Sequence, residues 1–184
     1  MAHKLDRITF ITGNAGKAKY LADYFHIPVD HIELDLLEIQ SLDLDSVVRD
    51  KALRAYEHVR RRALVEDVSL ECKGLNGLPG PLIKWFIEAL GREGICRLLD
   101  GKDRSAIATV AYGIADGSGV RIFKGSVSGK IAEHPRGESG FGWDPIFIPD
   151  GHAKTFGEMS SDEKHATSMR REALESMKIF FAHE

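Results

Sequence analysis

Residues 139 to 145 read Ser-Gly-Phe-Gly-Trp-Asp-Pro and combine two aromatic rings with a carboxylate. Phe141 and Trp143 offer flat apolar faces on which a planar heteroaromatic ring can stack, and Asp144 can accept hydrogen bonds from the edge of that ring. Gly142, between the rings, lets backbone approach such a ligand closely. This run indicates a binding site for a planar base, and its alternative is a structural turn with two core aromatics.

A second run, Thr12-Gly13-Asn14-Ala15-Gly16-Lys17, joins an apolar β-branched segment to one with apolar residues at helical spacing. Backbone N–H groups at a helix N-terminus bind anions, and the lysine adds a positive charge. The run therefore predicts phosphate binding, unless it is a plain strand-to-helix turn. It is not a Walker A loop, because its glycines are three positions apart and Ala18 stands where that motif has a hydroxyl residue.

Three acidic residues lie on two expected strands. Glu38 is near the end of one strand, and Glu66 and Asp67 are adjacent on another. Side chains of successive strand residues face opposite ways, so only one member of the adjacent pair should face a site. Carboxylates that converge from separate strands are ligands for Mg²⁺, which bridges phosphates. The alternative is a set of solvated acids at strand ends.

Four scattered cations could neutralise a triphosphate: Lys51, Lys84, Lys164 and Arg170. The alternative for each of them is an ordinary surface residue, which is the commoner case. Lys84 stands in Leu82-Ile83-Lys84-Trp85-Phe86, and these apolar neighbours predict that it is partly buried and has a partner.

Composition excludes several classes of protein. The chain has 184 residues, 43% of them hydrophobic, and a net charge of −3, which favours a single domain over residues 1–184 and argues against nucleic-acid binding. We expect no membrane span and no signal peptide, and the two cysteines have no metal-ligand spacing, so we expect a reduced, cytoplasmic protein. The histidines show no HExxH spacing, and no Gly-x-Ser-x-Gly elbow is present.

Hydrophobic periodicity then predicts the elements that position these residues. Strands are expected over 7–12, 31–39, 64–72, 105–116, 120–125, 127–133 and 146–149. Helices are expected over 17–25, 45–63, 81–90, 94–99 and 160–181. Asp45 is a predicted N-cap, and Ser160 with Glu163 a predicted capping box. Asp-Gly-Ser-Gly before residue 120 signals a hairpin. Strands joined by both helices and hairpins predict an α/β protein with a mixed sheet.

Several segments together resemble the inosine triphosphate pyrophosphatase family, the non-canonical purine NTP pyrophosphatases. They occur in the family's order and cover nearly the whole chain. The matching segments are Thr12-Gly13-Asn14-Ala15-Gly16-Lys17, Leu64-Val65-Glu66-Asp67, Leu75-Asn76-Gly77-Leu78-Pro79-Gly80-Pro81-Leu82-Ile83-Lys84-Trp85-Phe86, Phe141-Gly142-Trp143-Asp144-Pro145 and Lys154-Thr155-Phe156-Gly157-Glu158-Met159.

The resemblance implies a homodimeric α/β protein with a long mixed β-sheet flanked by helices and two lobes with a central nucleotide cleft. It implies Mg²⁺-dependent hydrolysis of ITP, dITP and XTP to the monophosphate and pyrophosphate, which cleanses the nucleotide pool.

By the same resemblance, residues 12–17 and Lys51 would hold phosphates, and Glu38 and Asp67 would hold Mg²⁺, with Asp67 also the catalytic base. The residues that would bind the rest of the substrate are Lys84, Phe141, Gly142, Trp143, Asp144, Lys164 and Arg170.

Two positions depart from the family pattern. The family has a histidine that is expected to donate to the purine edge where this chain has Met169, which cannot donate. Met169 also falls on the apolar stripe of its helix, so it either packs in the core or changes base selectivity. Val68 replaces a hydroxyl residue after Asp67. These changes leave one alternative function open: a nucleotide-binding protein of the same fold with weak activity or altered specificity.

Overall fold

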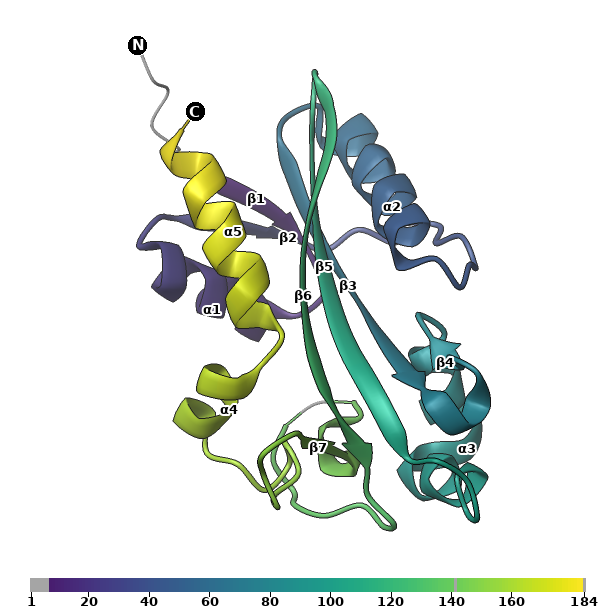
Figure 1. Cartoon of the computed structure of the whole chain (residues 1–184). Coiled ribbons are helices and arrows are strands. Elements are labelled where there is room, and N and C mark those ends of the chain that lie inside the picture. The colour runs from purple at the N-terminus through teal and green to yellow at the C-terminus, as the bar shows by residue number, and fades with distance from the viewer. Residues whose placement is uncertain (1–6, 141, 184) are drawn as a thin grey trace. The chain divides into compact units, whose positions relative to one another are not determined.

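The computed structural model describes residues 7–140 and 142–183. They form a mixed seven-stranded sheet in the hydrogen-bonded order β2-β1-β3-β5-β6-β7, with β4 paired to β3, together with helices (Figure 1). This confirms the predicted α/β class. The strands are β1 (Ile8–Ile11), β2 (Val29–Ile32), β3 (Ala63–Cys72), β4 (Pro79–Gly80), β5 (Ser105–Asp116), β6 (Gly119–Ile131) and β7 (Phe147–Pro149). The helices are α1 (Ala15–Phe25), α2 (Leu44–Val59), α3 (Ile83–Leu98), α4 (Ser161–Thr167) and α5 (Arg170–Ala182), with short 3-10 turns η1 (Lys73–Leu75) and η2 (Asp144–Ile146).

The chain divides into two compact units. Unit 1 comprises residues 1–67, 111–124 and 172–184, and unit 2 comprises 68–110 and 125–171. The one-domain, two-lobed organisation and its nucleotide cleft stay predictions.

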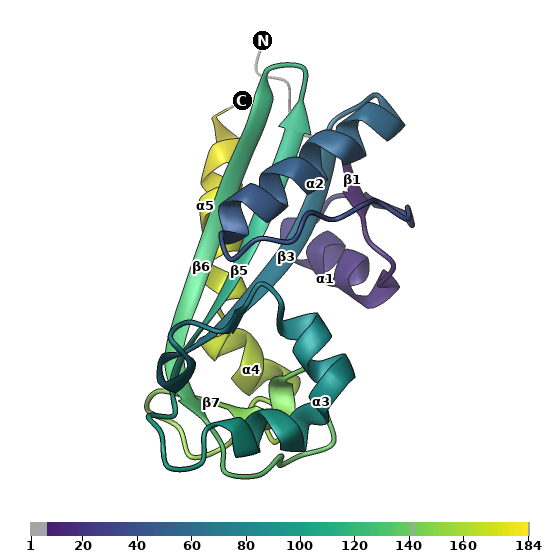
Figure 2. The ribbon, with the colours of Figure 1, turned by 90° about the vertical axis from the view of Figure 1, so that its right-hand side faces the viewer.

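In unit 1, the central strand β1 is parallel to both of its neighbours, β2 and β3. All four residues of β1 are buried, as expected of a parallel strand covered on both faces. Helix α2 lies on the opposite side of these strands from α5 (Figures 1 and 2). It approaches β5 very closely at Gly113, where an added Cβ would lie 2.7 Å from Cγ1 of Val48. The apolar core under α2 contains Ile11, Leu44, Val48, Ala52, Ala55, Ala63, Val65, Ala111 and Ala115.

The N-cap of helix α2 lies two residues earlier than predicted. Asp43, not Asp45, is its N-cap, because the Asp43 carboxylate accepts hydrogen bonds from the backbone N–H groups of Asp45 and Ser46 at 3.2 Å. The helix ends at Val59 instead of reaching 63, and Arg60 follows in the left-handed conformation.

The strand expected over 31–39 is only partly present, since β2 ends at Ile32. Burial nevertheless continues to alternate beyond the strand, and Leu34 and Leu36 pack against the core under α2. The alternation of apolar and polar residues correctly indicated an extended backbone with one packed face. Such a backbone does not require a neighbouring strand. This extended segment carries Glu38.

In unit 2, β4 and β7 are antiparallel to β3 and β6, respectively. The two helices expected over 81–90 and 94–99 are halves of α3, which is kinked at Gly91, where φ is +67°.

The single helix expected over 160–181 is instead two helices, α4 and α5. The predicted capping box of Ser160 and Glu163 is present, but the backbone of Ser168 is extended and interrupts the helix. Ser168 Oγ accepts a hydrogen bond from the N–H of Arg170 at 3.2 Å, and α5 begins there.

Candidate active site

The glycine loop of unit 1 places the N-terminus of α1 directly after β1. Thr12 Oγ1 accepts the N–H of Asn14 at 3.1 Å, and Asn14 Oδ1 caps the helix by accepting the N–H of Lys17 at 3.2 Å. Ala15 and Gly16 are already helical, so α1 starts two residues before the predicted position. A Cβ on Gly16 would lie 3.1 Å from the capping oxygen, which explains a glycine there. The arrangement directs the positive end of an 11-residue helix at the loop.

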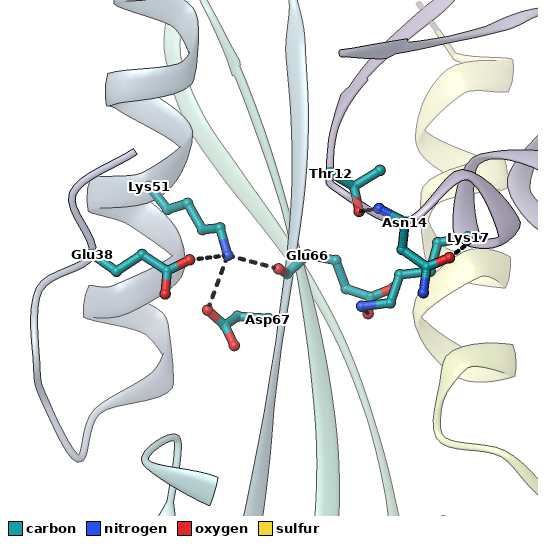
Figure 3. Close-up of polar contacts among 7 residues, drawn as sticks. All are labelled: Thr12, Asn14, Lys17, Glu38, Lys51, Glu66 and Asp67. Carbon is teal, nitrogen blue, oxygen red and sulfur yellow. Dashed lines mark hydrogen bonds and ion pairs between the residues drawn. The ribbon is translucent and has the colours of Figure 1, made fainter. Parts of the chain in front are cut away.

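Glu66 and Asp67 lie on opposite faces of β3, as their adjacency predicts (Figure 3). A carboxylate oxygen of Glu66, Oε1, lies 2.8 Å from Nζ of Lys17 on the side of the glycine loop. Asp67 Oδ2 lies 3.3 Å from Nζ of Lys51 on the side of α2. The Glu66 side chain is only 3% exposed, whereas that of Asp67 is 20% exposed.

Lys51 joins three chain segments through one ammonium group. Besides Asp67, its Nζ contacts Glu38 Oε1 at 2.5 Å and the backbone oxygen of Glu66 at 3.3 Å (Figure 3). Burial disfavours the charged ammonium, but the carboxylates of Asp67 and Glu38 outweigh burial and raise the pKa of Lys51 above its ordinary value. Lys51 therefore stays charged at neutral pH.

The carboxylates of Glu38 and Asp67 converge on this ammonium and so lie close to each other. Mg²⁺ is commonly bound by one or two carboxylates plus substrate phosphates, and these two oxygen donors fit that pattern. Across residues 7–140 and 142–183, no three His, Cys, Asp or Glu side chains gather as a larger metal-binding group. The donor set therefore fits a cation that is shared with a bound phosphate.

In unit 2, Asp144 and Lys164 form an ion pair. Lys164 Nζ lies 2.5 Å from Oδ2 of Asp144, whose side chain is 8% exposed. Gly140 makes room for this carboxylate, since an added Cβ there would lie 2.4 Å from Oδ2. Trp143 is also buried and packs edge-on against Phe147, with ring centroids 5.5 Å apart. A stacking role for Trp143 stays a prediction, and Phe141 lies outside the described residues.

Lys84 is not buried, contrary to the expectation from its apolar neighbours. It is exposed, and its Nζ lies 5.1 Å from the ring centroid of Trp85, which is itself 49% exposed. The first turn of α3 buries Ile83 instead, and the following two residues face solvent.

Met169 is buried, with 3% exposure, and it precedes α5 instead of lying on a continuous helical stripe. Burial agrees with core packing for this residue. Arg170, the first residue of α5, is half-buried.

Two further contacts, besides those of Lys51, were not predicted from the sequence. The ion pair of Lys17 with Glu66 was not predicted, because the sequence indicated only that one of Glu66 and Asp67 faces a site. The burial of Glu66 in the structure is what requires a cation beside it. Arg92 donates from Nε to the backbone oxygen of Gly142 at 2.6 Å. No sequence pattern links these two residues, because they are separated by 50 positions.

Within the described part of the chain, every helix is too short or too polar to cross a membrane. The model of the Ham1 family matches residues 8–180. Inosine triphosphate pyrophosphatase 1 of Trypanosoma cruzi is 42% identical over 180 residues, which cover 95% of this chain and 92% of that protein. The inosine triphosphate pyrophosphatase of Yarrowia lipolytica is 40% identical and covers 96% of each chain.

Among solved structures, a HAM1 protein from Coxiella burnetii superposes with a TM-score of 0.85 at 26% identity, covering 97% of this chain and 99% of that one. Sequence and structure comparisons thus agree over almost the full length. The chain belongs to the Ham1 family.

Proposed function

We propose that this protein hydrolyses non-canonical purine nucleoside triphosphates (ITP, dITP and XTP) to the monophosphate and pyrophosphate. One observation carries the proposal: in a chain related to inosine triphosphate pyrophosphatases, Glu38, Lys51 and Asp67 converge within hydrogen-bonding distance. Two acids and a cation at one point suit a phosphate-bound metal and an attacking water.

Asp67 is the proposed general base, and it shares Mg²⁺ with Glu38. Bound Mg²⁺ would offset phosphate charge and lower the pKa of a coordinated water. The Asp67 carboxylate orients the attacking water and takes its proton as the water oxygen bonds to the α-phosphorus, and the metal would only supply positive charge beside it. The bond from the α-phosphorus to the oxygen bridging to the β-phosphate breaks, and pyrophosphate leaves. The Asp67 side chain is 20% exposed, so water can reach its carboxylate.

The phosphates are assigned to the N-terminus of α1, Lys17 and Lys51. The helix N-terminus favours anions, and Lys17 offsets the phosphate charge of the bound substrate. Lys51 stabilises the charge that develops on pyrophosphate as it departs. Lys51 lies beside both proposed metal ligands, so a triphosphate bound there would give its ammonium a further anionic partner.

The remaining substrate-binding assignments rest on the family resemblance. Lys84 and Lys164 would bind the substrate, the segment Phe141–Asp144 would receive the purine, and Arg170 would complete the base pocket. Lys164 is held by Asp144, and an ammonium so held can donate to the 6-oxo group of hypoxanthine or xanthine. The 6-amino group of adenine would instead meet another donor, which disfavours ATP. A homodimeric, cytoplasmic enzyme is part of the same proposal.

A substrate panel tests the function. Purified protein is incubated with Mg²⁺ and ITP, XTP, GTP or ATP, and the nucleotide and phosphate products are identified. We expect IMP or XMP with one pyrophosphate per turnover and slower reaction of GTP and ATP. Release of orthophosphate would contradict attack at the α-phosphorus. ITP binding in calorimetry without turnover would favour a nucleotide-binding protein.

A further inference from the structure

We propose that Glu66 is a positioning residue that fixes the ammonium of Lys17 where it meets the substrate's phosphates. The inference rests on the proposed function, because it takes Lys17 to be a phosphate ligand. Glu66 itself is placed away from the substrate and acts through Lys17.

The burial of Glu66 supports this role. Its side chain is 3% exposed and its carboxylate lies 2.8 Å from Lys17 Nζ, whereas the Lys17 side chain is 29% exposed. A buried carboxylate must be paired, so it holds a nearby ammonium strongly. Lys17 is also fixed at its backbone, where its N–H donates to the Asn14 cap at 3.2 Å. The flexible four-carbon stem of the lysine is thus held at both ends while part of it stays open to solvent.

Glu66 also contacts the second phosphate-binding lysine, but through a different group. Its backbone oxygen lies 3.3 Å from Lys51 Nζ, on the other face of β3 from its carboxylate (Figure 3). A substitution of the Glu66 side chain keeps this carbonyl. It should therefore alter Lys17 and leave Lys51 in place.

Two physical effects of the Glu66 carboxylate oppose each other, and they predict opposite results. Its negative charge weakens attraction between the site and phosphates, so its removal would tighten substrate binding if charge alone mattered. Its hold on Lys17 pre-organises a ligand, so its removal would weaken substrate binding if positioning dominates. We infer that positioning dominates, because the contact is short and the carboxylate is buried.

Glu66→Gln is the deciding variant, since it removes the charge and keeps the shape. We expect KM for ITP to rise about tenfold, because the loss of one charge-assisted hydrogen bond weakens binding by about that factor. The value of kcat should change less than about twofold. The dissociation constant for inorganic tripolyphosphate should rise by a similar factor. In a Lys17→Met background only the charge effect remains, so the same substitution should lower KM or leave it unchanged. In a Lys51→Met background it should still raise KM.

Glu71→Gln is the matched control, because Glu71 lies on the same strand, is exposed and pairs with Ser69 Oγ at 3.1 Å. It should leave both constants unchanged. Circular dichroism and thermal unfolding establish whether each variant is folded. If Glu66→Gln does not fold, Glu66→Asp keeps the charge and withdraws the carboxylate by one methylene, and the same rise in KM is expected.

An unchanged or lower KM in a folded variant with Glu66 alone substituted would overturn the inference, as would a full effect of Glu66→Gln in the Lys17→Met background. Failure of the proposed function is a separate result: the wild-type protein would not turn over ITP. Tripolyphosphate binding would then still test the link between Glu66 and Lys17.

Discussion

The ammonium of Lys51 in α2 lies 2.5 Å from Oε1 of Glu38, which belongs to a segment without helix or strand hydrogen bonding. The proposed metal ligand Glu38 is therefore positioned by its contact with Lys51 of α2 and by the packing of Leu34 and Leu36 against the apolar core. Its backbone lacks the support of a strand ladder, so side-chain contacts determine where this carboxylate lies.

Glu38→Gln should weaken metal binding while the fold is kept. Loss of one of the two proposed carboxylate ligands should raise the Mg²⁺ concentration for half-maximal rate by at least about 10–100-fold, because losing a group that only contacts a metal ligand already costs that much affinity. Mg²⁺ titration of ITP hydrolysis measures it. Asp35→Asn, an exposed acid on the same segment, serves as the control. An identical Mg²⁺ dependence in Glu38→Gln would remove Glu38 from the metal site.

Asp67→Asn should lower kcat about 10²–10⁴-fold, because a general base contributes rate enhancements of that size. The amide keeps the shape of the side chain and can accept a hydrogen bond from Lys51, so the melting temperature should change little. Steady-state kinetics with ITP and thermal unfolding measure both quantities. Asp45→Asn, which changes a half-buried acid of α2 that pairs with Lys124 at 2.9 Å, should retain wild-type kcat. Full activity of Asp67→Asn would exclude it as the base.

Gly113→Ala should lower the free energy of unfolding by about 1–3 kcal/mol, because a new methyl group overpacks the contact between β5 and α2. The added Cβ would lie 2.7 Å from Val48 and 3.2 Å from Ala52, which precede and follow Lys51 on the helix. Urea unfolding measures the change. Gly117→Ala is the matched control: its Cβ would lie 3.5 Å from the Tyr56 hydroxyl, an ordinary contact, and its effect should stay within about 0.5 kcal/mol. Equal effects of the two substitutions would contradict the close approach at Gly113.

The stabilising effect of Glu163 should disappear in acid. Hydrogen bonds from Lys154 and from the Ser160 backbone lower the pKa of Glu163 from 4.5 to about 2. A lowered pKa in the folded protein means that stabilisation is complete above pH 4.5 and is lost as the pH falls towards 2. Thermal unfolding of wild type and Glu163→Gln should therefore differ at pH 7 and converge near pH 2. A difference that does not depend on pH would show that ionisation of Glu163 is irrelevant.

The two thiols should be unreactive in the native protein. Burial raises the pKa of Cys72 to about 12 and that of Cys96 to about 11, so both are protonated at pH 8. Ellman's reagent should react slowly with native protein and fast after unfolding in urea. Since both values lie above the ordinary 9.0, stability should also fall as the pH rises from 9 towards 12. Rapid labelling of the native protein at pH 8 would contradict this burial.

Local geometry accounts for what the sequence predicted correctly. The opposite orientations of Glu66 and Asp67 follow from the two-residue period of a strand, and the capping box at Ser160 follows from hydrogen bonds within one turn. These features depend on neighbours in the chain, so a single sequence is enough to predict them. The resemblance placed Glu38 and Asp67 in one site, and the structure brings both to Lys51.

Tertiary contacts account for what the sequence did not predict. Apolar neighbours suggested that Lys84 is buried, but its helix turns it towards solvent. Gly140 belongs to the run that indicated a ligand site, and in the structure it makes room for the Asp144 carboxylate. The sharing of Lys51 by two acids could not be predicted either, because Glu38 and Asp67 meet only when three segments pack together.

The alternation at Glu66 and Asp67 makes the pairing of charges depend on strand register. Ala63 and Leu64 of β3 lie opposite Thr9 and Phe10 of β1, which fixes the register. Inserting one residue between positions 64 and 66, or deleting Val65, would turn the Glu66 carboxylate towards Lys51 and the Asp67 carboxylate towards Lys17. The length of this short stretch is therefore as tightly constrained as the identity of the acids, and changes of two residues should be better tolerated than changes of one.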